Sequence, residues 1–161
     1  MIILGIDPGF GKMGCAILKK TGVCDNLIYS TCLTTDKKLP YEKRLLFLGK
    51  EVKKIISKFK PNVIAVEKVF FFKNQKTAFQ VAEIRGIILY LAVVNQIPVK
   101  EFTPLQVKIS LTGYGRAEKQ QVQKMVQVIL NPPAGGKKMS KQDDEIDAIA
   151  IALTCSSCLQ A

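Results

Sequence analysis

The sequence predicts an α/β fold in which a mixed five-stranded sheet is flanked by helices. Three observations lead to this prediction. Apolar, strand-like segments open the chain at 2–6, 13–18 and 26–33, with turn-forming residues between them. Strand-like and helical segments then alternate, which is typical of strands separated by covering helices. The chain has 161 residues, about half of them apolar, so we expect residues 1–161 to form a single domain.

Each element has its own signal. The three opening strands lie close together in the chain and are expected to form an antiparallel meander, with turns at Thr21–Gly22 and Asp25–Asn26. Apolar residues recur every three or four positions over 41–59, which predicts a helix that Pro61 ends. Similar signals predict the remaining elements, which are strands at 62–67 and 99–102, helices at 76–95, 104–111 and 117–130, and a final helix after the loop at 131–141.

The predicted helix at 76–95 is apolar almost all round in its second half. Such a helix is expected to be buried on more than one side. It is either a core helix or a helix at a subunit interface, and the sequence leaves both open.

The charge balance points to a polyanionic partner. The chain has 24 lysine and arginine residues against 13 acidic residues, a formal net charge of +11. Nucleic acid is the usual partner of so basic a domain, and we favour it over a basic surface that is simply solvated. An anionic membrane surface fits less well, because no segment combines a basic face with an exposed apolar one.

The sequence also predicts a cytoplasmic protein. The longest apolar run, 86–94, is too short to span a bilayer, and the N-terminus lacks the pattern of a secretory signal. Five cysteines are an odd number, and Cys155 and Cys158 fall at the C-terminal end of a helix, where the dipole disfavours a thiolate. We therefore expect reduced structural thiols and not a redox or zinc site.

The chain contains no histidine. A Ser-His-Asp arrangement and imidazole metal ligands are therefore excluded. Any acid–base or metal chemistry must rest on carboxylates and lysines.

Four acidic residues lie within five positions of KQDDEIDAIAIAL (141–153), at the start of an apolar helix. They are Asp143, Asp144, Glu145 and Asp147. The helix macrodipole stabilises acids in a first turn by about 0.3–1 kcal/mol each, which accounts for two of the first three. It accounts less well for Asp147, which lies further in among apolar neighbours. Helical spacing places Asp147 on one face with Asp143 or Asp144 and does not choose between them.

Two further acids end apolar strands. Asp7 follows IILGI and Glu67 follows NVIAV. Open α/β sheets bind ligands at the carboxyl ends of their strands, so these two acids and two aspartates of the last helix could form one site. An all-oxygen site suits Mg²⁺ and needs no histidine. Two such ions can hold an attacking water and a leaving oxygen for phosphoryl transfer, while a basic surface holds a nucleic-acid backbone.

Five motifs, in order along nearly the whole chain, carry a family resemblance. They are ILGIDPG, AVEKVFFFKN, EIRGIIL, PLQVKISLTGYGRAEKQQVQKMV and D-x-x-D-A-I-A-I-A. The sequence resembles the RuvC-type Holliday-junction resolvases, which have the ribonuclease H-like fold. The resemblance implies a homodimeric endonuclease that nicks two strands of like polarity in a four-way DNA junction, during recombination and repair. It also implies Mg²⁺ as cofactor, with Mn²⁺ able to substitute, and a branch-migration motor as a possible partner.

The resemblance assigns the acids one by one. It implies that Asp7, Glu67, Asp144 and Asp147 are the catalytic metal ligands, and the D-x-x-D-A spacing selects Asp144 over its neighbour Asp143. Asp143 is an additional acid that could share this role.

Basic and aromatic residues are assigned in the same way. The resemblance places Lys108 and Lys119 near the scissile phosphate, and Lys119 lies in the first turn of a helix, where phosphates bind well. It makes Phe70 an aromatic wedge that stacks on unpaired bases beside the active site. With Lys73, Arg116 and Lys119, Phe70 is expected to contact DNA.

Three other functions are alternatives to this one. An RNA-processing nuclease of the same fold would differ in its preferred substrate. A junction-binding protein without activity is a second alternative, but negative charge beside phosphates would not help it. A nucleotide-binding turn of the actin and sugar-kinase type in GIDPGFGKMG requires two large lobes, for which 161 residues are too few.

Overall fold

The computed structural model describes residues 1–22, 24–68, 75–130 and 142–159. It confirms the predicted fold class, with five strands in one mixed sheet in the order β3-β2-β1-β4-β5. The strands are β1 (Ile2–Asp7), β2 (Lys12–Thr21), β3 (Cys24–Thr34), β4 (Val63–Glu67) and β5 (Val99–Phe102). β1 to β3 form the expected antiparallel meander, whereas β4 pairs in parallel with both β1 and β5.

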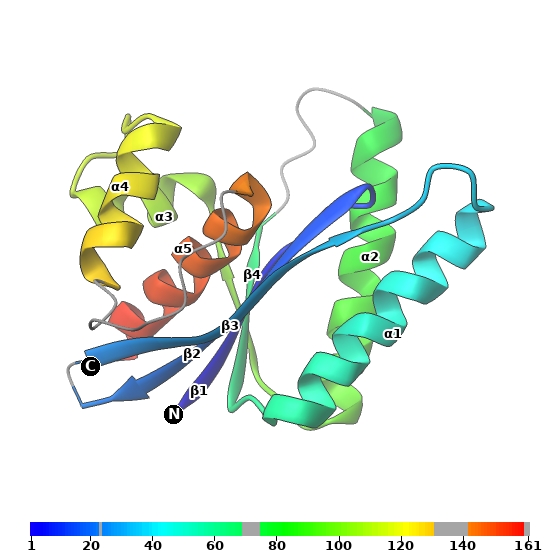
Figure 1. Ribbon diagram of the computed structural model, residues 1–161, viewed down its shortest axis with the longest axis horizontal. Coiled ribbons are helices and arrows are strands. Elements are labelled where there is room, and N and C mark those ends of the chain that lie inside the picture. The colour runs from blue at the N-terminus through cyan, green and yellow to red at the C-terminus, as the bar shows by residue number, and fades with distance from the viewer. Residues whose placement is uncertain (23, 69–74, 131–141, 160–161) are drawn as a thin grey trace.

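Helices cover both faces of the sheet (Figure 1). They are α1 (Tyr41–Phe59), α2 (Gln75–Val94), α3 (Pro104–Thr112), α4 (Lys119–Ile129) and α5 (Asp143–Cys158). α1 and α2 pack on one face, and α5 crosses the other face with α3 and α4 outside it. None of the helices in the described ranges is long and apolar enough to cross a membrane.

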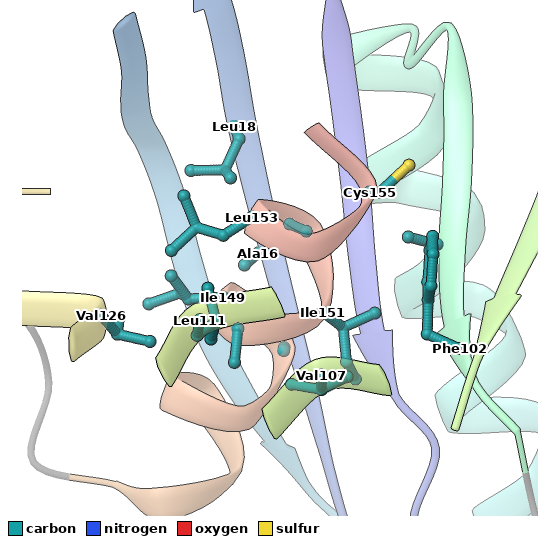
Figure 2. Packing of buried hydrophobic residues seen from close by; sticks show 14 of the residues in the cluster. Ala16, Leu18, Phe102, Val107, Leu111, Val126, Ile149, Ile151, Leu153 and Cys155 are labelled. Atoms are coloured by element: carbon teal, nitrogen blue, oxygen red, sulfur yellow. The ribbon is translucent and has the colours of Figure 1, made fainter. Parts of the chain in front are cut away.

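The sheet separates two hydrophobic cores, because its central strands are buried on both faces. Ile3 of β1 belongs to the core beneath α5, while its neighbours Leu4 and Ile6 belong to the core beneath α1 and α2. Figure 2 shows the first core, with Leu153 of α5 packed near Leu18 of β2. Burial of each such side chain contributes about 1.5–3 kcal/mol, so α5 is held firmly against the sheet.

Two glycines let the N-terminal half of α5 lie unusually close to the sheet. A Cβ atom on Gly5 of β1 would lie 2.3 Å from the backbone oxygen of Ala148, and one on Gly14 of β2 would lie 1.8 Å from that of Asp144. No side chain fits at either position. The acid-rich first turn of α5 therefore rests directly on β2.

The structure corrects one predicted turn. Asp25 and Asn26 lie within β3, where they pair with Lys20 and Lys19 of β2. Among the described residues, the turn falls at Gly22, which has a φ of +62° and lies between the end of β2 and the start of β3. Asp25 also accepts a hydrogen bond of 2.7 Å from the Ser156 hydroxyl. This contact with α5 and the strand pairing outweigh the local turn preference of Asp and Asn.

α2 is less buried than its sequence suggests. Phe79, Tyr90, Val93 and Val94 are 59–74% exposed on the single chain. The opposite face of α2, which includes Ile88 at 0% exposure, belongs to the core, so the core-helix alternative is confirmed for that face only. The exposed face leaves the subunit-interface alternative as a prediction. Gly86 also lies on this exposed face, with open space where a side chain would be.

Candidate active site

The site lies at the carboxyl ends of two parallel neighbouring strands. Ile6 of β1 pairs with Val66 of β4, so the residues that follow, Asp7 and Glu67, end their strands at the same edge of the sheet. The N-terminal end of α5, orange in Figure 1, lies beside the end of β4 and brings Asp144 and Asp147 to this edge. Side chains from opposite ends of the chain thus meet because a parallel strand pair and a crossing helix share one edge.

Asp7 is the electrostatic centre of this group. The pKa of its carboxyl is raised from 3.8 to about 7, mainly by burial and then by the charges of Glu67, Asp147 and Asp144, in that order. Lys119 only partly opposes this effect. The like charges around Asp7 are therefore not balanced by the protein itself.

Two neighbouring acids, Glu67 and Asp147, also have raised pKa values. Burial and the charge of Asp147 raise the pKa of Glu67, although hydrogen bonding to Asp7 and the charge of Lys119 lower it. Burial also raises the pKa of Asp147, against the hydrogen bond and the charge of Lys119. Three carboxyl groups of one site thus have raised pKa values, and perturbed pKa values of this kind cluster at functional sites.

Lys119 at the start of α4 joins two of the acids of α5. Its Nζ lies 2.9 Å from Oδ2 of Asp147 and 3.4 Å from Oδ2 of Asp143. Burial lowers the pKa of Lys119, but the contacts with these two carboxylates raise it overall, so its positive charge is retained. Gln123, one turn further along α4, donates from Nε2 to Oδ1 of Asp143 at 3.0 Å.

A cavity of about 200 Å³ opens between α3, α4 and α5 beside the acids. Its polar lining consists of Glu67, Lys108, Lys119 and Asp147, and its remaining lining is mainly apolar. Two of the predicted acids and both predicted lysines therefore face one space.

The other predicted DNA contacts are placed differently. Arg116 is exposed in the connection between α3 and α4 and does not line this cavity. Phe70 and Lys73 lie outside the described residues, so their predicted contacts stay predictions.

The structure adds residues that the sequence did not indicate. Ser30 and Cys32 of β3 contact Glu145 and Asp144 of α5, at 2.8 and 3.8 Å. Polar residues that alternate along a strand were the only available signal, and they are common on ordinary solvated faces. All five cysteines lie in the described ranges and are free, as expected.

The chemistry of the donor set fits a hard divalent cation. All four predicted ligands offer carboxylate oxygens, which such ions prefer, and their mutual repulsion would be relieved by positive charge. Within the described ranges, no three acidic or cysteine side chains already form a metal-binding group. The acids are thus gathered at one edge without forming a finished coordination shell.

Comparison with known proteins identifies the family. The family model described as crossover junction endodeoxyribonuclease RuvC matches residues 3–155. A protein of that name from Ruminiclostridium cellulolyticum is 46% identical over 153 residues, covering 95% of this chain and 90% of the relative. A second, from Thermosipho melanesiensis, is 43% identical over 152 residues and 94% of each chain.

A solved structure of a RuvC protein has the same fold as this chain. Thermus thermophilus RuvC in complex with a Holliday junction substrate superposes with a TM-score of 0.91 at 30% identity, covering 99% of this chain and 95% of the other. The fowlpox virus resolvase, at 18% identity and a TM-score of 0.66, shares the fold. The family model, the sequence relatives and the fold together show that the chain belongs to the RuvC family of crossover junction endodeoxyribonucleases.

Proposed function

We propose that this chain is a metal-dependent endonuclease that resolves four-way DNA junctions by paired, symmetric nicks in homologous recombination and DNA repair. One observation carries the proposal. Asp7, Glu67, Asp144 and Asp147 act on one another electrostatically at one sheet edge, beside Lys119, in a chain with a net charge of +11. Unbalanced negative charge in so basic a protein is expected where a cation must be held against a phosphate.

The four acids are the proposed metal ligands. Family membership implies dependence on a divalent metal, and we infer Mg²⁺, two ions in each site, with Mn²⁺ able to substitute. When bound, the ion would supply Lewis-acid stabilisation of the charge that develops at the scissile phosphate. Asp143 is bound by Lys119 and Gln123, and unlike Asp144 it is not among the charges that raise the pKa of Asp7, so we assign it no ligand role.

Lysines and the surface charge hold the DNA. We infer that Lys108 and Lys119, which line the cavity, contact the oxygens of the scissile phosphate. Lys119 also keeps Asp147 oriented through their 2.9 Å ion pair. Phe70, Lys73 and Arg116 are the further proposed DNA contacts. Net positive charge binds the phosphate backbone without regard to sequence.

A homodimer completes the proposal. A two-fold axis would present two identical sites to two strands of a junction. The exposed face of α2 with Phe79, Tyr90, Val93 and Val94 is the proposed interface, because large contiguous apolar patches are rare on monomeric proteins. Gly86 would let a partner helix approach closely. We also propose a single cytoplasmic domain, with a branch-migration motor as an additional partner.

Replacing Val93 on this face with glutamate should give monomers that nick one strand at a time, because a buried unpaired charge opposes association. Light scattering would report the mass, and a junction in a supercoiled cruciform would separate single from paired nicks. Val128→Glu is the matched control, since Val128 is 60% exposed on α4. An unchanged dimer in Val93→Glu would assign the interface to another surface.

The decisive test is cleavage of a labelled synthetic four-way junction beside a linear duplex of the same sequence, with Mg²⁺ and with chelator. Symmetric nicks in the junction alone, lost with chelator, are the expected result. Tight binding without cutting in any divalent metal would instead leave a junction-binding protein. Faster cleavage of a matched RNA substrate would favour an RNA-processing nuclease.

A further inference from the structure

Glu145, like Asp143, belongs to the acid cluster but has no part in the proposed chemistry. Glu145 is only 7% exposed, and α5 around it belongs to an apolar core. A buried carboxylate is costly unless it is hydrogen-bonded. Glu145 accepts such a bond at its Oε2 from the Ser30 hydroxyl of β3, at 2.8 Å.

A second contact joins the same two elements. The Cys32 thiol lies 3.8 Å from Oδ2 of Asp144, a distance suited to a weak S–H donor. Ser30 and Cys32 are two residues apart on a strand, so they share one face. That face meets two consecutive acids of α5, of which only Asp144 is a proposed metal ligand.

The other side of the helix is held by α4. Asp143 contacts Lys119 and Gln123 there. Successive residues of a helix are about 100° apart, so Asp143 and Glu145 point to widely different sides of the first turn. Asp144 lies between them in sequence. Restraints on both flanking residues therefore fix the rotation of this turn about the helix axis.

The sheet beneath α5 restricts the position of its first turn. The backbone of Asp144 rests on Gly14, where there is no space for even a methyl group. Translation toward the sheet is thus blocked by contact, and rotation is limited by the side contacts. We propose that Ser30 and Glu145 are positioning residues, whose hydrogen bond sets the orientation of Asp144 and Asp147 for metal binding.

This inference rests on the proposed function, because it assumes that Asp144 and Asp147 hold the metal. It differs from a purely structural role in what it predicts. If the hydrogen bond only offset the burial of Glu145, its loss would lower the melting temperature and leave the folded protein's metal affinity unchanged. If it positions the acids, metal affinity and kcat must fall as well.

The test compares four variants with the parent: Ser30→Ala, Ser30→Thr, Glu145→Gln and Thr31→Ala. Thr31→Ala removes a hydroxyl from the adjacent position of β3, which faces the opposite side of the sheet. Calorimetric titration with Mg²⁺ alone gives the metal affinity, and junction binding is measured in chelator. Single-turnover cleavage at saturating junction gives the rate of the chemical step.

For Ser30→Ala we expect Mg²⁺ affinity and the cleavage rate each to fall roughly tenfold, with junction binding within about twofold of the parent. Ser30→Thr and Glu145→Gln should stay near the parent, because the first keeps the donor and the second keeps an acceptor oxygen. Thr31→Ala should also match the parent.

Two results would overturn the inference. One is parental metal affinity and cleavage in Ser30→Ala, whatever its melting temperature. The other is a Glu145→Gln protein as impaired as Ser30→Ala, since charge and not the hydrogen bond would then matter. If the parent itself binds no Mg²⁺ and cuts no junction, the proposed function fails and this inference fails with it.

Discussion

Replacing Asp7 with asparagine should lower junction cleavage by roughly a thousandfold or more, a magnitude typical of lost electrostatic stabilisation in an active site. Asp7 is the acid on which the charges of Glu67, Asp144 and Asp147 all act, so its loss alters the whole group. Junction binding should persist, because phosphate contacts and not carboxylates hold the DNA. Cleavage and gel-shift assays on the same preparations would separate the two effects.

The same substitution should stabilise the metal-free protein at high pH. The pKa of Asp7 is about 7 in the folded protein and near 3.8 in the unfolded chain, so folding favours the protonated form. Its contribution to stability is therefore complete below about pH 4 and is lost as the pH rises through 7. In chelator at about pH 8, Asp7→Asn should raise the free energy of unfolding by on the order of 2 kcal/mol, a gain that shrinks toward about pH 4.

Urea unfolding at several pH values would measure this gain. Equal stability of the two proteins at high pH would mean that Asp7 ionises freely and is not crowded by the other acids. Substantial cleavage by Asp7→Asn would remove it from the proposed ligand set.

Asp144→Asn should also lose cleavage, by about a hundredfold or more, whereas Asp143→Asn should stay within a few fold of the parent. The two residues are adjacent but lie in different surroundings. The side chain of Asp143 is 62% exposed and is bound to Lys119 on the α4 side. Asp144 is half-buried near Cys32, and its charge raises the pKa of Asp7.

Single-turnover cleavage of the junction with each variant is the measurement. A Mg²⁺ titration would show whether excess metal restores either protein. If Asp143→Asn were inactive and Asp144→Asn active, Asp143 and not Asp144 would be the metal ligand. Equal loss in both would mean that Asp143 shares the ligand role.

Much of the fold could be predicted because the local signals were strong. The helical spacing that Pro61 ends gave α1 with its observed bounds, and VKEF gave β5. The hairpin before β3 was predicted less well. Asp25 and Asn26 prefer turns locally, but strand pairing and the contact with Ser156 decide their conformation. Such contacts across the chain leave no trace in a short window of sequence.

The candidate site could also be predicted only in part from the sequence. Acids that end apolar strands and begin an apolar helix indicated the group, but helical spacing could not choose between Asp143 and Asp144. Their difference comes from α4 and β3, which flank the helix. Ser30 and Glu145 were missed for the same reason, since their contact depends on how α5 crosses the sheet.

The crossing of α5 over β1 and β2 would also decide when the proposed active site is complete. Asp7 and Glu67 belong to the first half of the chain, while Asp144 and Asp147 arrive only with the last helix. One hydrogen bond that seats this helix, from Lys20 to Ser156, spans 136 residues of sequence. A chain still being synthesised would thus expose a basic surface able to hold nucleic acid before it could cut. Cutting would begin only when α5 docks, so an incompletely folded chain would be unable to cleave DNA.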